Sequence, residues 1–499
     1  MERLSAHRLA HLRPALPTAA WVGFLGSCLI GIGRLGWWIG ANASDHTAWA
    51  RGIRDLMTRE LVGAITFAGV AVLLVAWMLL RRELTRERPR FWTVFIAWAV
   101  PILPLAGILS SDARFYSDIG WMVSRGDDPY LTGLGTTGSP FPVGEAWYGT
   151  MSVYPPLAVR LMGLLTSITG AHWYWTVVSM RVLAMIGIGL LAWALPRLAA
   201  RAGVDPRKAL WLGIFNPLTF IHGFGGMHID MLMSGVMAAA LVLALRRRGL
   251  LWGALMVGVA ASIKQPALLA AVPVALLAPA TRTERWPRTI ARTALSIVIA
   301  VGAMVAVSYA CGFGTRVLAA AEAGATSMHA VKTGTVARMV SEAIIYVRSL
   351  LGLTTPKALF GSMDTVALVI AGVVVVVVYL RYRRRPFDFL AAASLAFILG
   401  SPAFREWYLL IWISFVGLAT LGPWMRRAVS VLVPFAAVYG AFKTYLGWAI
   451  PPAFWAGIGV AAAANASSWL VGPNALPADQ AVPTEPVDAV GTAADSAEA

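Results

Sequence analysis

Long apolar runs recur along this 499-residue chain, and they restrict its fold more than any other feature. A helix needs roughly 20 apolar residues to cross the hydrocarbon core of a bilayer, and runs such as 19–40, 61–80 and 361–380 approach that length. Inside the hydrocarbon every backbone polar group needs an internal partner, which a helix supplies. The sequence therefore predicts an all-α polytopic membrane protein, and counting runs by length and flanking charge predicts about 14 spanning helices.

The formal net charge of +17 raises the question of a nucleic-acid partner. The arginines, however, lie in short clusters at the ends of apolar runs, as at 81–90 and 381–385. Such clusters are typical of cytoplasmic loops. We therefore attribute the charge to membrane topology, expect no nucleic-acid partner, and predict a multi-pass protein of the plasma membrane embedded in the lipid bilayer.

The chain is predicted to form one transmembrane domain over residues 1–471. The remaining segment, 472–499, is rich in alanine and proline and carries five acidic residues and no basic residue. This composition predicts a disordered acidic tail, because too little apolar surface is available to offset the entropy of ordering. Counting sides from the arginine clusters places the tail in the cytoplasm.

The run 249–279 is too long for one ordinary helix and carries Lys264-Gln265-Pro266 at its middle. Proline disfavours a helical conformation at the preceding residue, and arginines flank the run at both ends. The sequence therefore predicts a hairpin with Lys264 at its outer apex. The alternative is a single kinked helix that buries Lys264 in the membrane.

The segment 110–150 is acidic, whereas most other loops are rich in arginine. It follows the run 91–109, which we expect to span the membrane, and the positive-inside tendency places it on the outer side. We interpret Asp118, Asp127 and Asp128 as solvated loop residues. A carboxylate as close to the membrane as Asp112 is costly, however, and this cost predicts a function.

Charged residues from four separate places in the sequence are predicted to meet on the outer side. Taken singly, each has a structural explanation, such as helix capping by His228 or snorkelling by Lys264. Together they predict a cleft in which a general base lies beside several cations, which suits a phosphate-bearing substrate at a membrane surface. The residues are Asp112 and Arg114, His228 and Asp230, Lys264, and Arg405 and Glu406.

Several short motifs resemble, in order and spacing, those of the actinobacterial polyprenol-phosphomannose-dependent α-1,6-mannosyltransferases, which are membrane glycosyltransferases of the GT-C fold. The resemblance covers most of the chain, from about residue 90 to 410. The motifs are SDARFY at 111–116, Asp128-Pro129-Tyr130, Tyr154-Pro155-Pro156-Leu157, Asn216-Pro217-Leu218, GGMHIDMLM at 225–233, Ile263-Lys264-Gln265-Pro266-Ala267 and Trp407-Tyr408.

The resemblance implies a GT-C-like, inverting transferase that moves mannose from a polyprenyl-phosphate mannose donor to the α-1,6-mannan chain of a lipoglycan acceptor. Asp112 matches the catalytic carboxylate of the family, and the resemblance thus implies that 110–150 is the catalytic outer loop. No metal ligands are implied, but enzymes of this fold vary in metal dependence, so a divalent cation stays open as a cofactor. The implied substrate-binding residues are Arg114, Tyr116, Tyr130, Tyr154, His228, Asp230, Lys264, Arg405, Glu406, Trp407 and Tyr408.

The chain departs from the family pattern beside the predicted site. Arg114 stands where an aromatic residue is usual, Ile229 where an asparagine follows the histidine, and Glu406 where a proline precedes Trp-Tyr. Two alternatives therefore stay open: a related transferase that uses lipid-linked arabinofuranose or another sugar, and a lipid-glycan transporter without catalysis. The sequence shows no inverted repeat, and this favours the enzyme over the transporter.

Overall fold

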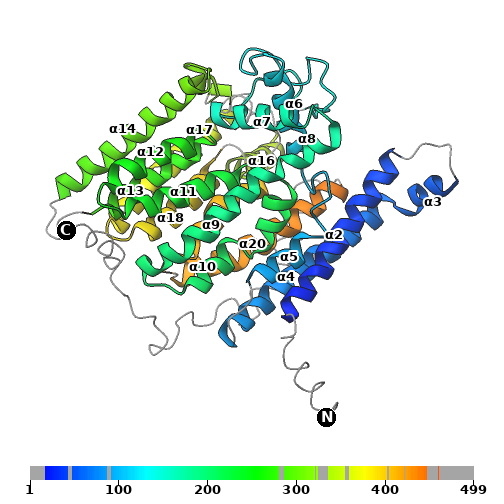
Figure 1. The fold of residues 1–499 in the computed structure, drawn as a ribbon, viewed down its shortest axis with the longest axis horizontal. Coiled ribbons are helices and arrows are strands. Elements are labelled where there is room, and N and C mark those ends of the chain that lie inside the picture. The colour runs from blue at the N-terminus through cyan, green and yellow to red at the C-terminus, as the bar shows by residue number, and fades with distance from the viewer. Residues whose placement is uncertain are drawn as a thin grey trace, which may run out of the picture.

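In the computed structural model, every regular element of the described residues is a helix, as the apolar runs predict (Figure 1). The structure describes residues 17–42, 48–86, 91–145, 147–279, 286–320, 322–323, 335–354, 359–401, 404–420, 422–446 and 459. The elements are α2 (Thr18–Asn42), α3 (Ala48–Leu56), α4 (Arg59–Arg86), α5 (Phe91–Ala99), α6 (Asp112–Ser124), α7 (Pro156–Ile168), α8 (Trp173–Ser179), α9 (Arg181–Ala202), α10 (Pro206–Gly213), the π-helix η1 (Thr219–Gly225), α11 (Asp230–Ala244), α12 (Gly249–Ala261), the 3-10 helix η2 (Gln265–Ala270), α13 (Ala271–Leu277), α14 (Trp286–Ala310), α16 (Val336–Leu350), α17 (Leu359–Tyr382), α18 (Pro386–Gly400), the 3-10 helix η3 (Glu406–Tyr408), α19 (Leu409–Val416) and α20 (Pro423–Leu446).

Five helical segments of the described residues are long and apolar enough to cross a bilayer, which supports the membrane assignment. A sixth span would be formed by η1 and α11 together, which meet at an angle of 101°. Other apolar helices have only 10–17 residues, so the total of about 14 spans stays a prediction. Residues 453–471, the last apolar run of the predicted transmembrane domain, and the tail 472–499 lie outside the described residues, apart from Gly459. The five segments are Thr18–Gly36, Arg59–Glu83, Trp173–Ala202, Trp286–Ala310 and Leu359–Tyr382.

The expectation of one spanning helix over 91–109 is wrong. Helix α5 ends at Ala99, and the chain continues through turns to Ser111. Pro101 and Pro104 explain the early end, because proline lacks an N–H donor and disfavours helical geometry at the residue before it. The turn segment 100–110 therefore carries backbone carbonyls that have no helical partner.

The predicted hairpin around Lys264 is confirmed. Gly253 of α12 packs on Val274 of α13, because a Cβ atom at Gly253 would lie 2.8 Å from Val274 Cγ1. These two residues are almost equally far from Lys264 in the chain, which excludes a single kinked helix. The side of the membrane on which the apex lies stays a prediction.

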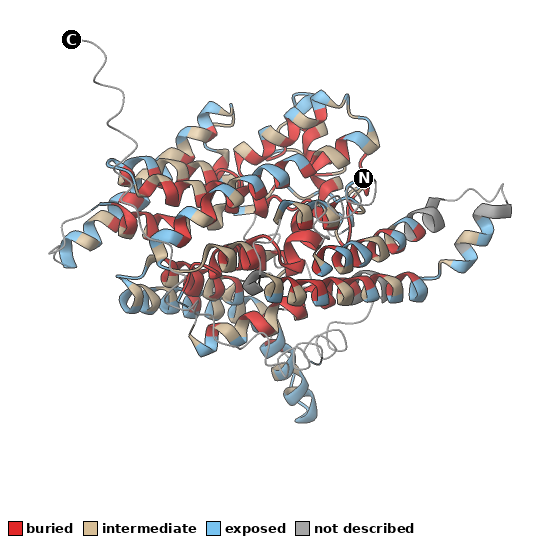
Figure 2. Ribbon diagram, turned by 60° about the horizontal axis from the view of Figure 1, so that its bottom comes forward, coloured by how far each residue is buried: buried red, intermediate tan, exposed pale blue. Residues whose placement is uncertain are grey.

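Helices α6, α7 and α8 and the long α6–α7 connection lie together at one end of the helix bundle (Figure 1). Buried residues gather where neighbouring helices face one another, and exposed residues follow the outward faces (Figure 2). The outward faces are often apolar, as at Val369 and Val376 of α17, which is expected of a surface in contact with lipid.

Candidate active site

Asp112 and His228 approach each other at the junction of two irregular segments. Asp112 is the first residue of α6, and His228 lies in the turn between η1 and α11. The distance from Asp112 Oδ2 to His228 Nδ1 is 3.3 Å, and the side chains are 19% and 0% exposed, respectively. The carboxylate is therefore the accessible member of the pair, and the imidazole is its buried support.

The surroundings of Asp112 favour its charged form. Burial by itself would raise the pKa of Asp112, but the close imidazole of His228 and the positive charges of Arg405 and Lys264 outweigh that effect. The net result is a pKa for Asp112 below its ordinary value. Its place at the N-terminus of α6 also favours a negative charge. A carboxylate that stays ionised at neutral pH is able to accept a proton.

His228 is held by an aromatic ring and by a glycine. Its ring stacks on Trp407, with centroids 4.0 Å apart and planes 15° from parallel. A Cβ atom at Gly226 would lie 2.9 Å from His228 Cδ2 and 3.1 Å from Nε2, so a larger residue there would displace the imidazole. Met227, between them, has a φ of 59°, which is strained for a residue other than glycine.

Lys264 and Asp230 form a buried ion pair beside this dyad. The ammonium lies 2.7 and 2.8 Å from the two carboxylate oxygens of Asp230 and sits 4.5 Å from the centre of the Tyr408 ring. Two of its three protons are thus engaged by Asp230. Asp230 begins α11, where the helix dipole favours its charge.

Arg405 approaches the same cluster from the strand-like segment before η3. Its guanidinium lies 5.7 Å from the centre of the Trp407 ring, and its charge acts on Asp112. Within the described residues, no ion pair or hydrogen bond engages this guanidinium. The adjacent Glu406 is 2% exposed. Arg405 is therefore a half-buried cation whose hydrogen-bond donors are open to a ligand.

Three tyrosines predicted to bind substrate join α6 to the chain before α7. Tyr154 donates its hydroxyl proton to the Tyr116 hydroxyl oxygen at 3.3 Å, and Tyr130 donates to the Tyr154 carbonyl at 2.6 Å. All three side chains are buried. In this conformation they pack against one another and against neighbouring aromatic rings, and their contact with substrate stays a prediction.

Arg114 is half-buried beside the like charge of Arg34 in α2. No ion pair links Arg114 to an acidic group in the part of the chain that the structure describes. The structure therefore does not bring Arg114 into the cluster around Asp112, His228 and Lys264. Its contact with substrate also stays a prediction.

The interpretation of Asp118 as a solvated loop residue is wrong, whereas the side chain of Asp128 is 30% exposed. Asp118 is fully buried and accepts a hydrogen bond from the Gly135 N–H at 3.0 Å, and burial raises the pKa of its carboxyl group. Asp128 accepts from the Tyr130 N–H at 2.8 Å and pairs with Arg316 at 3.0 Å. Both carboxylates bind within or next to the α6–α7 connection, and sequence patterns do not reveal these contacts.

Sequence reasoning missed Arg181, a buried residue inside the candidate span Trp173–Ala202 that contacts the segments before both Asp112 and His228. The available signal was its position, because arginine within a spanning segment is rare. Among the described residues, no group of three or more His, Cys, Asp or Glu side chains is arranged to hold a metal ion.

Comparisons with known proteins point to one family. A family profile described as "Alpha-(1->6)-mannopyranosyltransferase, N-terminal domain" matches residues 20–280, more than half of the chain. "Alpha-(1->6)-mannopyranosyltransferase A" of Corynebacterium glutamicum is 31% identical over 219 residues, 41% of this chain and 44% of the relative.

The protein of the same name from Mycobacterium tuberculosis is 32% identical over 265 residues, half of each chain. Thus the match spans about half the length of these first two relatives. A "Probable alpha-(1->6)-mannopyranosyltransferase" of Mycolicibacterium smegmatis is 28% identical over 468 residues, 84% of this chain and 82% of the relative.

Proposed function

This chain belongs to the alpha-(1->6)-mannopyranosyltransferase family, and from that premise we propose that it transfers mannose from polyprenyl-phosphate mannose to the α-1,6-mannan chain of a lipoglycan such as lipomannan or lipoarabinomannan. The reaction is proposed to occur at the outer face of the membrane. The observation that carries the proposal is the pairing of an accessible carboxylate, Asp112, with the buried His228 at 3.3 Å.

In the proposed reaction, an acceptor hydroxyl oxygen attacks C1 of a β-linked mannosyl phosphate from the face opposite the phosphate. The new C1–O bond forms while the bond from C1 to the phosphate oxygen breaks, and the electron pair of that bond leaves with the lipid phosphate. Asp112 accepts the hydroxyl proton, and a single inversion gives an α-mannoside. General-base catalysis of this kind typically contributes roughly 10²–10⁴ in rate.

The exposure of the two side chains assigns their roles. His228 is fully buried, and its Nε2 edge lies against Gly226, so the imidazole has no open path to an acceptor hydroxyl. Asp112 retains exposed surface and a lowered pKa. We therefore assign the base to Asp112 and its orientation and charge stabilisation to His228.

The leaving phosphate gains negative charge as the reaction proceeds, and fixed cations stabilise that charge more in the transition state than in the ground state. The guanidinium of Arg405 has donors available, whereas Lys264 is engaged by Asp230. We therefore assign the first phosphate contact to Arg405. The ammonium of Lys264 also acts on Asp112, although the carboxylate of Asp230 balances its charge.

The test is a transfer assay with the purified full-length protein in nanodiscs. Radiolabelled polyprenyl-phosphate mannose and a short α-1,6-mannoside acceptor are supplied, and the product is analysed for linkage. The expected result is label in an α-1,6-linked product, with little product from Asp112→Asn. If lipid-linked arabinofuranose, supplied in place of the mannose donor, gave product and the mannose donor did not, the related transferase would be indicated. Movement of the donor across the bilayer without any product would indicate a transporter.

A further inference from the structure

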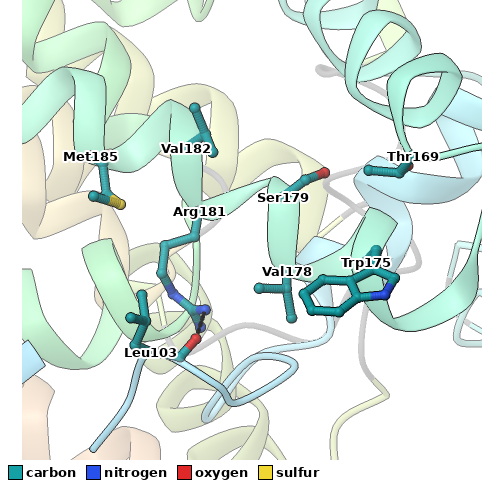
Figure 3. Close-up of a pocket in the computed structure, with 8 residues that line it drawn as sticks. All are labelled: Leu103, Thr169, Trp175, Val178, Ser179, Arg181, Val182 and Met185. Carbon is teal, nitrogen blue, oxygen red and sulfur yellow. Dashed lines mark hydrogen bonds between the residues drawn. The ribbon is translucent and has the colours of Figure 1, made fainter. Parts of the chain in front are cut away.

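Arg181 is a buried cation that lies between the two segments leading to the candidate site. It is the first residue of α9 and is only 2% exposed. Its Nε donates to the Phe224 carbonyl at 3.0 Å, its Nη2 donates to the Leu105 carbonyl at 2.7 Å, and its Nη1 donates to the Leu103 carbonyl. Figure 3 shows the side chain extending from α9 to Leu103. One guanidinium therefore contacts two separate segments.

The burial of this charge calls for an explanation. No carboxylate pairs with Arg181 in the described part of the chain, and a buried charge without such a partner is costly. The adjacent cavity of about 420 Å³ is lined mainly by apolar side chains, among them Val182 and Met185 (Figure 3). The three carbonyls are therefore its compensation, and two of them come from the turn segment 100–110, where helical partners are missing.

The segments that Arg181 contacts are also joined by their own backbone. Ile108 donates its N–H to the Gly225 carbonyl at 3.1 Å, and a Cβ atom at Gly225 would lie 2.4 Å from Ile108 Cδ1. The turn segment 100–110 thus packs directly against η1. The first of these segments leads to Asp112, and the second leads to His228.

Both connections to the site pass through a strained residue. Leu109 has a φ of 51° and Met227 a φ of 59°, in the left-handed region that residues other than glycine seldom adopt. Such conformations persist only where the surrounding structure holds them, and they concentrate at functional sites. The carbonyls that bind Arg181 lie four residues before Leu109, at Leu105, and three residues before Met227, at Phe224.

We propose that Arg181 is a positioning residue that sets the separation of Asp112 and His228 by holding the turn segment 100–110 against η1. The role in catalysis rests on the proposed transfer reaction, whereas the geometric role does not. Lysine would keep the charge, but a single ammonium cannot match the planar fork of three donors. Without the three donors of Arg181, the turn segment 100–110 and η1 are expected to move apart. His228 would then lie farther from Asp112 and would no longer lower its pKa.

The kinetic test compares Arg181→Gln and Arg181→Lys with the control Tyr174→Phe. Tyr174 donates to the Pro104 carbonyl at 2.7 Å, so the control removes a bond to the same turn segment without touching η1. For both arginine variants, kcat should fall by at least about tenfold while the KM for donor stays within about twofold. The acid limb of the pH–rate profile should move to higher pH. Tyr174→Phe should keep the normal profile.

A double variant separates positioning from general stability. If Arg181 acts through the Asp112–His228 pair, adding His228→Asn to Arg181→Gln should produce no further shift of the acid limb. If Arg181 had only a structural role, its substitution would lower the yield and the melting temperature but leave the pH profile of the folded fraction unchanged. That outcome would overturn the proposal. If Arg181→Gln does not fold, Arg181→Lys, which keeps the buried charge, replaces it in the double variant.

A crosslinking test needs no transfer activity. Asp112→Cys and His228→Cys are combined in a background with Cys28→Ser and Cys311→Ser, and the crosslink is a direct disulfide between the two new cysteines, followed after a small oxidant is added. Arg181→Gln should slow the crosslink several-fold, and an unchanged rate would overturn the positioning role even if the parent enzyme transfers mannose. A slowed crosslink in a protein without transferase activity would instead keep the positioning role and reject the proposed function.

Discussion

Lys264 donates to both carboxylate oxygens of Asp230, at 2.7 and 2.8 Å, from the apex of the α12–α13 hairpin to the first residue of α11. The pair is 14% and 3% exposed. Removing one partner from such a buried pair leaves an uncompensated charge, whereas replacing both with apolar residues of similar size is often neutral. The pair therefore has a structural role that is separable from any contact with substrate.

A double-mutant cycle tests this role. Lys264→Met and Asp230→Leu should each lower the free energy of unfolding by about 3–5 kcal/mol, and the double variant should recover much of that loss. Melting temperature or denaturant unfolding in detergent measures the effect. Strictly additive losses in the double variant would show that the two side chains are not coupled.

Asp112→Asn should lower turnover by roughly 10²–10⁴ while donor binding is retained, because the amide keeps the shape but cannot accept the proton. Asp127→Asn, a half-buried residue of the same loop, is the matched control and should leave the rate nearly unchanged. Initial rates and donor affinity in nanodiscs are measured for both. An Asp112→Asn enzyme with more than about a tenth of normal activity would reject the base assignment.

His228→Asn should shift the acid limb of the pH–rate profile to higher pH. His228 helps to lower the pKa of Asp112, so its removal lets that pKa rise, and the base becomes protonated at a higher pH than in the parent enzyme. The profile of kcat/KM from acidic to neutral pH measures the shift. His172→Asn is the control, because His172 only caps α8 and asparagine also serves as a cap. An acid limb at the parent position would contradict the role of His228.

Gly226→Ala should reduce transfer by at least about tenfold without unfolding the protein. The added Cβ would lie 2.7 Å from the His222 carbonyl and 2.9 Å from the His228 ring, so the imidazole must move from Asp112. Gly144→Ala, where nothing lies within 4 Å of the added atom, is the control. Rates are compared at equal amounts of folded protein, and equal activity of the two variants would argue against a tightly placed His228.

Single cysteines test the predicted sidedness in a background without Cys28 and Cys311. Ser124→Cys, in the last turn of α6, should react with a membrane-impermeant thiol reagent added outside. Arg247→Cys, in the exposed basic turn before α12, should react only from the cytoplasmic side. Labelling of intact cells and of inverted vesicles gives the comparison. Reaction of Ser124→Cys only from the cytoplasmic side would overturn the outward placement of the site.

Local sequence patterns predicted the long apolar helices and the hairpin around Lys264. Apolar length predicted the long helices, and the proline after Gln265 together with arginines at both flanks predicted the hairpin that the packing of Gly253 on Val274 confirms. The same reasoning drew attention to Asp112, because a carboxylate beside the membrane is costly. Helix length, the hairpin and the cost of a carboxylate beside the membrane depend only on neighbouring residues and on the solvent. They can therefore be predicted from the sequence alone.

Tertiary packing decided the rest. The sequence placed Asp112 and His228 on one side of a membrane, but only the meeting of α6 with the η1–α11 turn brings them to 3.3 Å and makes one accessible and the other buried. The sequence predicts a solvated Asp118, because its partner, the Gly135 N–H, comes from a distant part of the loop and leaves no local pattern. The position of Arg181 in an apolar segment is unusual, but the sequence does not identify its partners, because its three acceptors are backbone carbonyls, which every residue type possesses. Helix packing determines which residues far apart in the chain come into contact. The type of a residue alone says little about which distant residue it will contact.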